Sequence, residues 1–258
     1  MAELKPFIFV PLYIYPTETS WQPLLAAAAK HPQLFFKVVV NPQNGPGPEA
    51  LPDANYVTGL RALASLANVC VLGYIHCSWG EREQAELEND IIVYAGWTVR
   101  SPGLRIDGIF IDESPANPEL VGYVAATARF VRKTFANPAT VVYNPGVFVH
   151  VAFYQAADFI VIFENRASEW TSDFVQSNLS KLGPELRRKS IVIAHSCASQ
   201  GLQLKLGRRL FQEYGIPGQL VTTQAGYLSW CPSWESYWDA MRRWYNRSIT
   251  LEGTSAGV

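Results

Sequence analysis

The 258-residue sequence lacks the usual marks of metal, redox or membrane proteins. It has four cysteines and four histidines, and neither a CxxC pair nor an HxH or HExxH spacing occurs, which argues against a zinc hydrolase. No run of 18 apolar residues is present, so no transmembrane helix is expected. The formal net charge is −1, so nothing favours nucleic acid or an anionic membrane surface as a partner. We therefore expect no metal and no other cofactor.

Three further signals are missing from particular segments. The N-terminal stretch MAELKPFIFVPLYIYP lacks a small-residue cleavage site and is broken by Pro11, so it does not read as a signal peptide. If the chain is complete, this predicts a cytoplasmic protein. No phosphate-binding glycine fingerprint follows the first apolar run. The segment AHSCASQG lacks the G-x-S-x-G elbow, which makes Ser196 a weak nucleophile candidate, and a disulfide between Cys197 and Cys231 is left open.

What the sequence does contain is a series of short, nearly continuous apolar runs. Such runs are typical of strands covered on both faces, and 48% hydrophobic residues allow a sizeable core. Eight such strands alternating with helices over about 250 residues predict a single-domain α/β protein, a (β/α)8 TIM barrel spanning residues 1–258. The alternative is an open doubly wound sheet. The expected strands are Phe7–Tyr13, Phe35–Val40, Val69–Tyr74, Gly108–Ile111, Thr140–Tyr143, Phe159–Phe163, Ile191–Ala194 and Gln219–Thr222. The expected helices are Trp21–Lys30, Asn55–Ala67, Glu83–Trp97, Pro118–Phe135, Ser172–Leu182, Gly201–Tyr214 and Ser233–Tyr245.

Acidic residues end two of the expected strands. The segment DGIFIDES ends the fourth strand with Asp112 and Glu113, and FIVIFEN ends the sixth with Glu164. Catalytic side chains of such barrels stand at the carboxyl ends of the strands, and alternation points Asp112 inward. Carboxylates in one mouth can divide into a proton donor and a nucleophile or base. We therefore predict these three acids as the catalytic residues; the alternative is that they cap the next helices or pair with Arg166.

Polar and aromatic side chains at the other strand ends predict a sugar-binding rim, because ring faces stack on the apolar faces of pyranoses. Trp79, Trp170, Trp230 and Trp234 all follow strands, and the alternative for each is burial in the core. The two histidines at strand ends would donate hydrogen bonds to the substrate or be satisfied structural residues. The predicted substrate-binding residues are Tyr15, Asn41, Asn44, His76, Trp79, Asn144, His195, Gln224, Tyr227 and Trp230.

Several blocks of the sequence resemble the spherulin-4 family, also called spherulation-specific family 4. They are FVPLYIYP, VVVNPQNGPG, VLGYIHCSWG, DGIFIDE, VVYNPG and FIVIFEN, and the resemblance spans Phe7 to Tyr227. It implies a (β/α)8 fold and an activity like that of glycoside hydrolase family 135, whose fungal members cut within N-acetylgalactosamine-containing stretches of galactosaminogalactan. The family's essential acids correspond to Asp112, Glu113 and Glu164. The resemblance also implies an extracellular or cell-wall location, although this chain shows no signal.

Together, the residues and the resemblance predict an endo-acting glycoside hydrolase that retains configuration. Burial after an apolar run would raise the pKa of Glu164 and keep it protonated, which suits the acid. Asp112 would be the nucleophile or would orient the substrate's acetamido group, and Glu113 would hold Asp112 or the sugar.

Two other functions are weighed against this prediction. A chitinase-like enzyme would carry the pattern DGxDxDxE, but Phe110 stands at its middle Asp and Ser114 at its catalytic Glu. A non-catalytic glycan-binding or spore-wall protein on an inactive barrel is the second, and the presence of all three acids argues against it.

Overall fold

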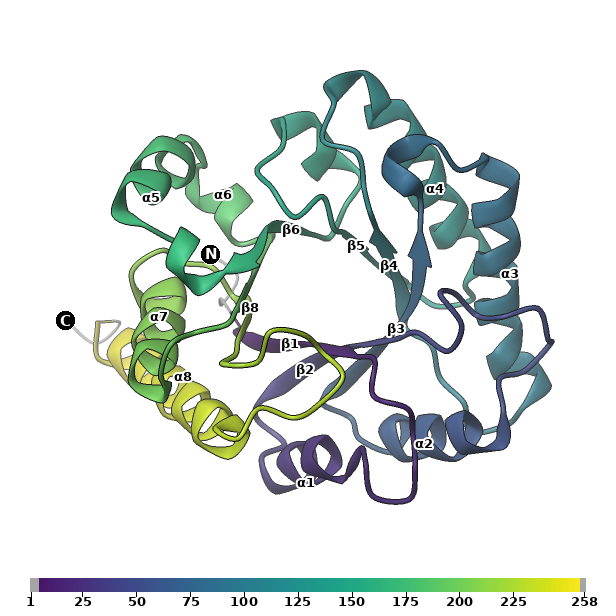
Figure 1. The fold of residues 1–258 in the computed structure, drawn as a ribbon, viewed down its shortest axis with the longest axis horizontal. Coiled ribbons are helices and arrows are strands. Elements are labelled where there is room, and N and C mark those ends of the chain that lie inside the picture. Colours follow the sequence, from purple (N-terminus) through teal and green to yellow (C-terminus); the bar gives the residue numbers. More distant parts are fainter. Residues whose placement is uncertain (1–4, 256–258) are drawn as a thin grey trace.

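Eight parallel strands close into a barrel inside a ring of helices in the computed structural model, which describes residues 5–255 and side chains as far as Tyr245 (Figure 1). The strands pair in chain order and β8 closes on β1, so the predicted (β/α)8 TIM barrel is confirmed and the open sheet is wrong. They are β1 (Phe7–Leu12), β2 (Phe35–Val40), β3 (Val69–His76), β4 (Gly108–Asp112), β5 (Thr140–Tyr143), β6 (Phe159–Arg166), β7 (Ser190–His195) and β8 (Gly218–Val221).

The helices cover the outer face of the barrel (Figure 1). They are α1 (Gln22–Lys30), α2 (Ala54–Ala64), α3 (Gln84–Arg100), α4 (Val121–Thr134), α5 (Ser172–Asn178), α6 (Pro184–Arg187), α7 (Gln200–Gln212) and α8 (Trp234–Ser255). Amphipathic spacing explains the long ones: α3 buries Leu87, Ile91, Tyr94 and Trp97 against the strands. Within residues 5–255, no helix combines the length and the apolar character needed to cross a membrane.

The element boundaries differ from the prediction at a few places. The strands β3 and β6 run further than expected, so His76 and Glu164 lie inside strands, whereas β1 stops one residue short of Tyr13. The expected helix Ser172–Leu182 is divided into α5 and a 3-10 turn over Leu179–Lys181. The separate short helix α6 then starts at Pro184, a position where the missing N–H of proline is not needed. The final helix continues ten residues past the expected end. Residues 1–4 of the N-terminal stretch lie outside the described part of the chain.

Aromatic contacts show which side chains enter the barrel. Phe9 of β1 and Phe110 of β4 lie with ring centroids 5.5 Å apart, and Phe110 also contacts Tyr74 of β3 at 6.1 Å. Three strands meet at these rings, so they lie in the interior. Because side chains alternate along a strand, Asp112 also points inward, two residues beyond Phe110. Gly73, next to Tyr74, faces outward, since a Cβ there would lie 2.7 Å from the ring of Tyr94 in α3.

A β-bulge in β6 turns Glu164 into the barrel. Phe159, at the start of this strand, lies inside against Phe7 with centroids 4.9 Å apart. Strict alternation from Phe159 would bring Phe163 inside and point Glu164 outward. The register of β6 against β7 shifts between Val161 and Phe163, and Phe163 packs outward on Trp170 at 5.0 Å. A bulge re-aims the side chains that follow it, so the carboxylate enters the mouth.

Candidate active site

Carboxylates from β4 and β6 meet at the carboxyl end of the barrel through one amide. Asn144 follows β5, the strand between them, and its Nδ2 donates to Asp112 Oδ1 at 2.7 Å and to Glu164 Oε2 at 2.6 Å. Both oxygens therefore lie within 2.7 Å of one nitrogen and are separated by no more than twice that distance. The two acids that the sequence placed at separate strand ends thus form one pair.

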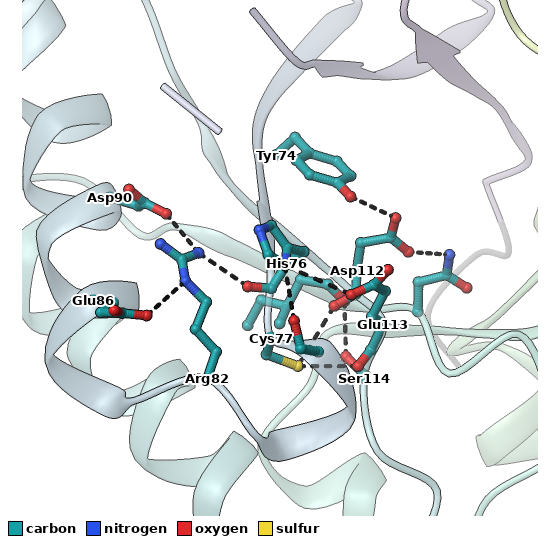
Figure 2. Close-up of polar contacts among 12 residues, drawn as sticks. Tyr74, His76, Cys77, Arg82, Glu86, Asp90, Asp112, Glu113 and Ser114 are labelled. Atoms are coloured by element: carbon teal, nitrogen blue, oxygen red, sulfur yellow. Dashed lines mark hydrogen bonds and ion pairs between the residues drawn. The ribbon is translucent and has the colours of Figure 1, made fainter. Parts of the chain in front are cut away.

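Two tyrosines complete the hydrogen bonding of the acid pair. Tyr74 of β3 donates to Asp112 Oδ2 at 2.9 Å, and Tyr227, after β8, donates to Glu164 Oε1 at 2.7 Å (Figure 2 shows the Tyr74 bond). All four carboxylate oxygens accept a hydrogen bond from the protein. The pair is therefore fixed from both sides before any ligand binds.

The electrostatics of the pair favour a protonated Glu164. Burial is the main cause that raises the pKa of this carboxyl, and the nearby charge of Asp112 adds to the rise. The hydrogen bonds from Tyr227 and Asn144 oppose it by stabilising the ionised form. The net direction is upward, as expected for a proton donor that follows an apolar run.

Glu113 faces away from Asp112. Its backbone lies in the left-handed region at φ 50°, and its carboxylate lies 3.6 Å from His76 Nδ1 rather than bonding to Asp112 (Figure 2). Its carbonyl accepts hydrogen bonds from the Trp79 amide at 2.7 Å and from the Cys77 thiol at 3.2 Å. The loop after β3 thus clamps the strained turn that carries both acids. The expected contact between Glu113 and Asp112 is not formed, whereas a contact with the sugar stays a prediction.

An arginine behind this turn anchors the end of β3. Arg82 donates to the His76 carbonyl at 3.0 Å and forms ion pairs with Asp90 at 2.8 Å and Glu86 at 3.2 Å (Figure 2). The side chains of Arg82 and Asp90 are mostly buried, so their charges are screened less than those of a surface pair. The backbone of His76, whose imidazole faces Glu113, is therefore held in place by Arg82.

The structure brings four of the ten predicted binding residues to the acids. Asn144 and Tyr227 bond to the pair, and His76 faces Glu113. Trp79 bonds to Glu113 through its backbone, while its side chain is 62% exposed at the rim, with φ 54°. A bulky side chain is strained in that conformation, so the fold presents this ring outward at an energetic cost.

Other predicted binding residues make contacts with the surrounding loops. Tyr15 donates to Asp53 at 3.1 Å, and Asn41 accepts from the Gly45 amide at 2.9 Å. Asn44 is exposed in the same loop, at φ 52°. These residues shape the rim between β1, β2 and α2 without reaching the acids.

The predicted residues on β7 and β8 likewise have local partners. His195 Nδ1 lies 3.0 Å from the Ser196 hydroxyl, and the Gln224 carbonyl accepts from the Ser196 amide at 2.8 Å. Trp230 donates to the Ser20 carbonyl at 2.6 Å and packs on Trp234 with centroids 4.9 Å apart. Their binding roles stay predictions.

Burial shows that two tryptophans expected at the sugar-binding rim belong to the core instead. Trp170 is 8% exposed and Trp234 is 6% exposed, so both belong to the core rather than to the rim. Cys197 and Cys231 are free thiols, so the disulfide that was left open is not formed.

The alternative that the three acids cap the next helices or pair with Arg166 is wrong. The turn after β4 is capped by Asn117, which accepts from the Glu119 amide at 3.1 Å, and α5 is capped by Thr171. In the part of the chain that the structure describes, no ion pair joins Arg166 to an acid of the site. Among the described side chains, which end at Tyr245, no cluster of three or more is arranged to ligate a metal.

Sequence reasoning missed two tyrosines of the site. Tyr74 bonds to Asp112, and the ring of Tyr13 lies between those of Tyr74 and Tyr227, with centroids 5.8 and 5.9 Å away. In the sequence both residues look like apolar members of the expected strands Phe7–Tyr13 and Val69–Tyr74. Alternation from the inward-facing Phe9 would have identified Tyr13, which lies four residues further along the chain.

We predict that Tyr227→Phe raises the pKa of Glu164 further, by about one unit or more. The lost hydrogen bond favours the ionised carboxylate, and bonds to charged groups contribute about 1.5–3 kcal/mol, with one pKa unit equal to about 1.4 kcal/mol. Carboxyl ¹³C NMR titration would measure the shift. Tyr74→Phe is the matched control, because it removes the same hydroxyl from Asp112 and should move Glu164 little. A Glu164 pKa that stays constant or falls in Tyr227→Phe would contradict the assignment.

The sequence and the fold are similar to those of known proteins. A family model described as spherulation-specific family 4 matches residues 7–241. Spherulin-4 of Physarum polycephalum is 30% identical over 198 residues, and the match covers 74% of this chain but only 56% of that protein's length. The crystal structure of Aspergillus clavatus Sph3 in complex with GalNAc is similar at a TM-score of 0.80 and 31% identity, covering 92% of this chain and 97% of that one. A chitinase from Bacteroides thetaiotaomicron, at a TM-score of 0.50 and 11% identity, covers 77% of this chain and 71% of its own and shares the fold alone.

Proposed function

This chain belongs to spherulation-specific family 4, and on that premise we propose that it is a glycoside hydrolase acting within a polysaccharide that contains N-acetylgalactosamine. The observation that carries the proposal is the pair Asp112 and Glu164, bridged by Asn144 in the barrel mouth. The similarity to a structure solved with bound GalNAc supports the sugar class.

In the proposed reaction Glu164 protonates the glycosidic oxygen as the bond to the anomeric carbon breaks. Its raised pKa supports this role, because an acid must carry its proton at the working pH. Asp112 attacks the anomeric carbon or orients the acetamido group that does so. A water then completes the second displacement, with Glu164 as the base.

The spacing of the pair supports retention of configuration. Retaining enzymes hold their carboxyl groups about 5–5.5 Å apart, whereas inverting enzymes leave about 6.5–9.5 Å for a water molecule. The Asp112 and Glu164 oxygens that Asn144 bridges lie 2.7 and 2.6 Å from its nitrogen, so their separation is at most the sum of those distances, which is below the inverting range. Asn144 is thus assigned the role of setting the separation of the pair.

The proposed function is tested by the release of new reducing ends. The protein would be incubated separately with galactosaminogalactan and with chitin, beside the double variant Asp112→Asn/Glu164→Gln. Release from galactosaminogalactan by the wild type alone is the expected result. Release from chitin alone would indicate the chitinase-like alternative. Binding to the first polymer without cleavage would indicate a glycan-binding protein on an inactive barrel.

We expect Trp79→Ala to weaken polymer binding several-fold, because an exposed ring beside the acids is suited to stack on a sugar. Its melting temperature should stay within a degree or two, since this side chain is mostly in solvent. Trp170→Ala is the control: that buried ring packs on Phe163 and Phe174, and its loss should cost about 3–5 kcal/mol of folding free energy. A large drop in melting temperature for Trp79→Ala with an unchanged KM would show that Trp79 is a structural residue.

A further inference from the structure

We propose that the hydroxyl of Tyr13 is a catalytic group that donates a hydrogen bond to an oxygen of the reacting sugar, in the space between Asp112 and Glu164. The inference rests on the proposed function and adds a residue to it. It follows from the position of this ring, from the hydrogen bonding around it and from its protonation state.

The position of Tyr13 follows from β1. Phe9 lies inside the barrel, and Tyr13 lies four residues further along, at the carboxyl mouth. Its ring stands nearly perpendicular to those of Tyr74 and Tyr227, at 88° and 81°. Those two rings bond to Asp112 and to Glu164, respectively. Tyr13 is therefore located between the two halves of the acid pair.

The hydroxyl of Tyr13 has no partner left among the acids. Asp112 already accepts from Asn144 and Tyr74, and Glu164 accepts from Asn144 and Tyr227, so each of the four oxygens is occupied. Within residues 5–245, no group forms a hydrogen bond with the Tyr13 hydroxyl, whereas its ring packs on those of Tyr74 and Tyr227 and against the core. A polar group kept beside an active site without a protein partner is available to a ligand.

The surroundings of Tyr13 fix it as a donor. Burial first, and then the charges of Asp112 and Glu164, raise the pKa of this phenol well above its usual value of 10. It therefore keeps its proton throughout the pH range of catalysis. The residue as a whole is only partly buried, whereas Tyr74 is 5% exposed. The acceptors that can reach this hydroxyl are thus the oxygens of a sugar bound between the two acids.

The sugar at the cleaved bond must occupy that same space. The acid and the attacking group flank the anomeric carbon on opposite sides, so oxygens attached to that sugar lie between the carboxylates. A fixed donor aimed at an oxygen whose charge changes during reaction stabilises the transition state more than the bound substrate. Loss of the Tyr13 hydroxyl should therefore lower kcat more than it raises KM.

Tyr13→Phe tests the proposal, because it removes only the hydroxyl and keeps the ring that packs on Tyr74 and Tyr227. Reducing-end release from galactosaminogalactan should show kcat lowered about 10²-fold, with KM changed less than threefold and an unchanged melting temperature. Tyr154→Phe is the control: its hydroxyl lies 3.2 Å from the Ser190 hydroxyl, away from the mouth, and kcat should stay at the wild-type value.

The outcomes separate this inference from the function on which it rests. A Tyr13→Phe variant with kcat within twofold of an active wild type would overturn the catalytic role and leave the hydrolase proposal standing. A fall in kcat accompanied by a drop of several degrees in melting temperature would assign the residue a structural role instead. A wild type that releases no reducing ends would overturn both proposals together.

Discussion

Replacing Glu164 by Gln should lower turnover by about 10²-fold or more, because loss of a positioned general acid typically has an effect of that size. Gln keeps the shape of the side chain: its carbonyl can accept from Asn144 while its amide donates to the Tyr227 hydroxyl. The fold should therefore remain intact. Reducing-end release, with circular dichroism as a check on folding, would measure both effects. The matched control is Glu185→Gln, whose side chain is 83% exposed on α6.

The same substitution should change how stability depends on pH. The folded state raises the pKa of Glu164 above its unfolded value, so the folded protein favours the protonated form. The associated stability is fully present below the unfolded pKa and is lost as pH rises through the folded pKa. Gln cannot ionise, so Glu164→Gln should melt at a higher temperature than the wild type at neutral pH, and Glu185→Gln should not. Equal turnover or a lower melting temperature in Glu164→Gln would contradict its role as the buried acid.

The structure explains why replacing Glu164 should make the protein less active but more stable. Burial makes the ionised carboxylate unfavourable, and that is what keeps a proton available for the leaving group. The protein tolerates this cost at one position because Tyr227 and Asn144 hydrogen-bond to the carboxyl. A gain in stability on replacement is typical where function requires a group that the fold disfavours.

The barrel could be predicted from the sequence because its cause is local. Each strand is a short apolar run covered on both faces, and the interval between runs suits one helix. The boundaries that differed, such as the end of β6 at Arg166, depend on pairing with β7. That pairing is a contact between distant segments, which a pattern along one strand does not contain.

The acids were predictable by position, but the orientation of Glu164 was not. Alternation correctly pointed Asp112 inward, because Phe110 and Asp112 share one face of β4. In FIVIFEN every residue before Glu164 is apolar, so nothing in the sequence marks which one is extra. The bulge between Val161 and Phe163 arises from the register with β7 and reverses the side chains that follow.

The tyrosines of the site and the residues of the rim were also difficult to predict from the sequence. Tyr74 looks like a strand residue in the sequence, because its ring is apolar and only its hydroxyl reveals a polar role. The rim depends on loop conformations such as Trp79 at φ 54° and Ser196 at φ 52°. Exposure likewise separates Trp79 from Trp170, although both follow a strand.

Replacing Asp112 by Asn should also lower turnover about 10²-fold or more, because the variant can neither attack the anomeric carbon nor accept a proton from an acetamido N–H. The geometry can persist, since Asn can accept from Asn144 and donate to the Tyr74 hydroxyl. Glu113→Gln is predicted to show a loss of similar size if Glu113 holds the sugar. If instead Glu113 only positions His76, which lies 3.6 Å away, Glu113→Gln should lower turnover less. Near wild-type turnover in both variants would show that this strand end is not the site.

The anomer that the wild type releases first should have the configuration of the cleaved bond. Both oxygens bridged by Asn144 lie within 2.7 Å of its nitrogen, so they are closer together than the about 6.5–9.5 Å of inverting enzymes, which favours retention. NMR on a defined oligosaccharide would identify the first product before mutarotation. A substrate with a trifluoroacetamido group separates the two retaining routes, because fluorine weakens the acetamido oxygen as a nucleophile. A steep loss of rate would assign the attack to that oxygen, with Asp112 orienting it, and a small loss would assign it to Asp112. An inverted first product would overturn both routes while leaving the hydrolase proposal intact.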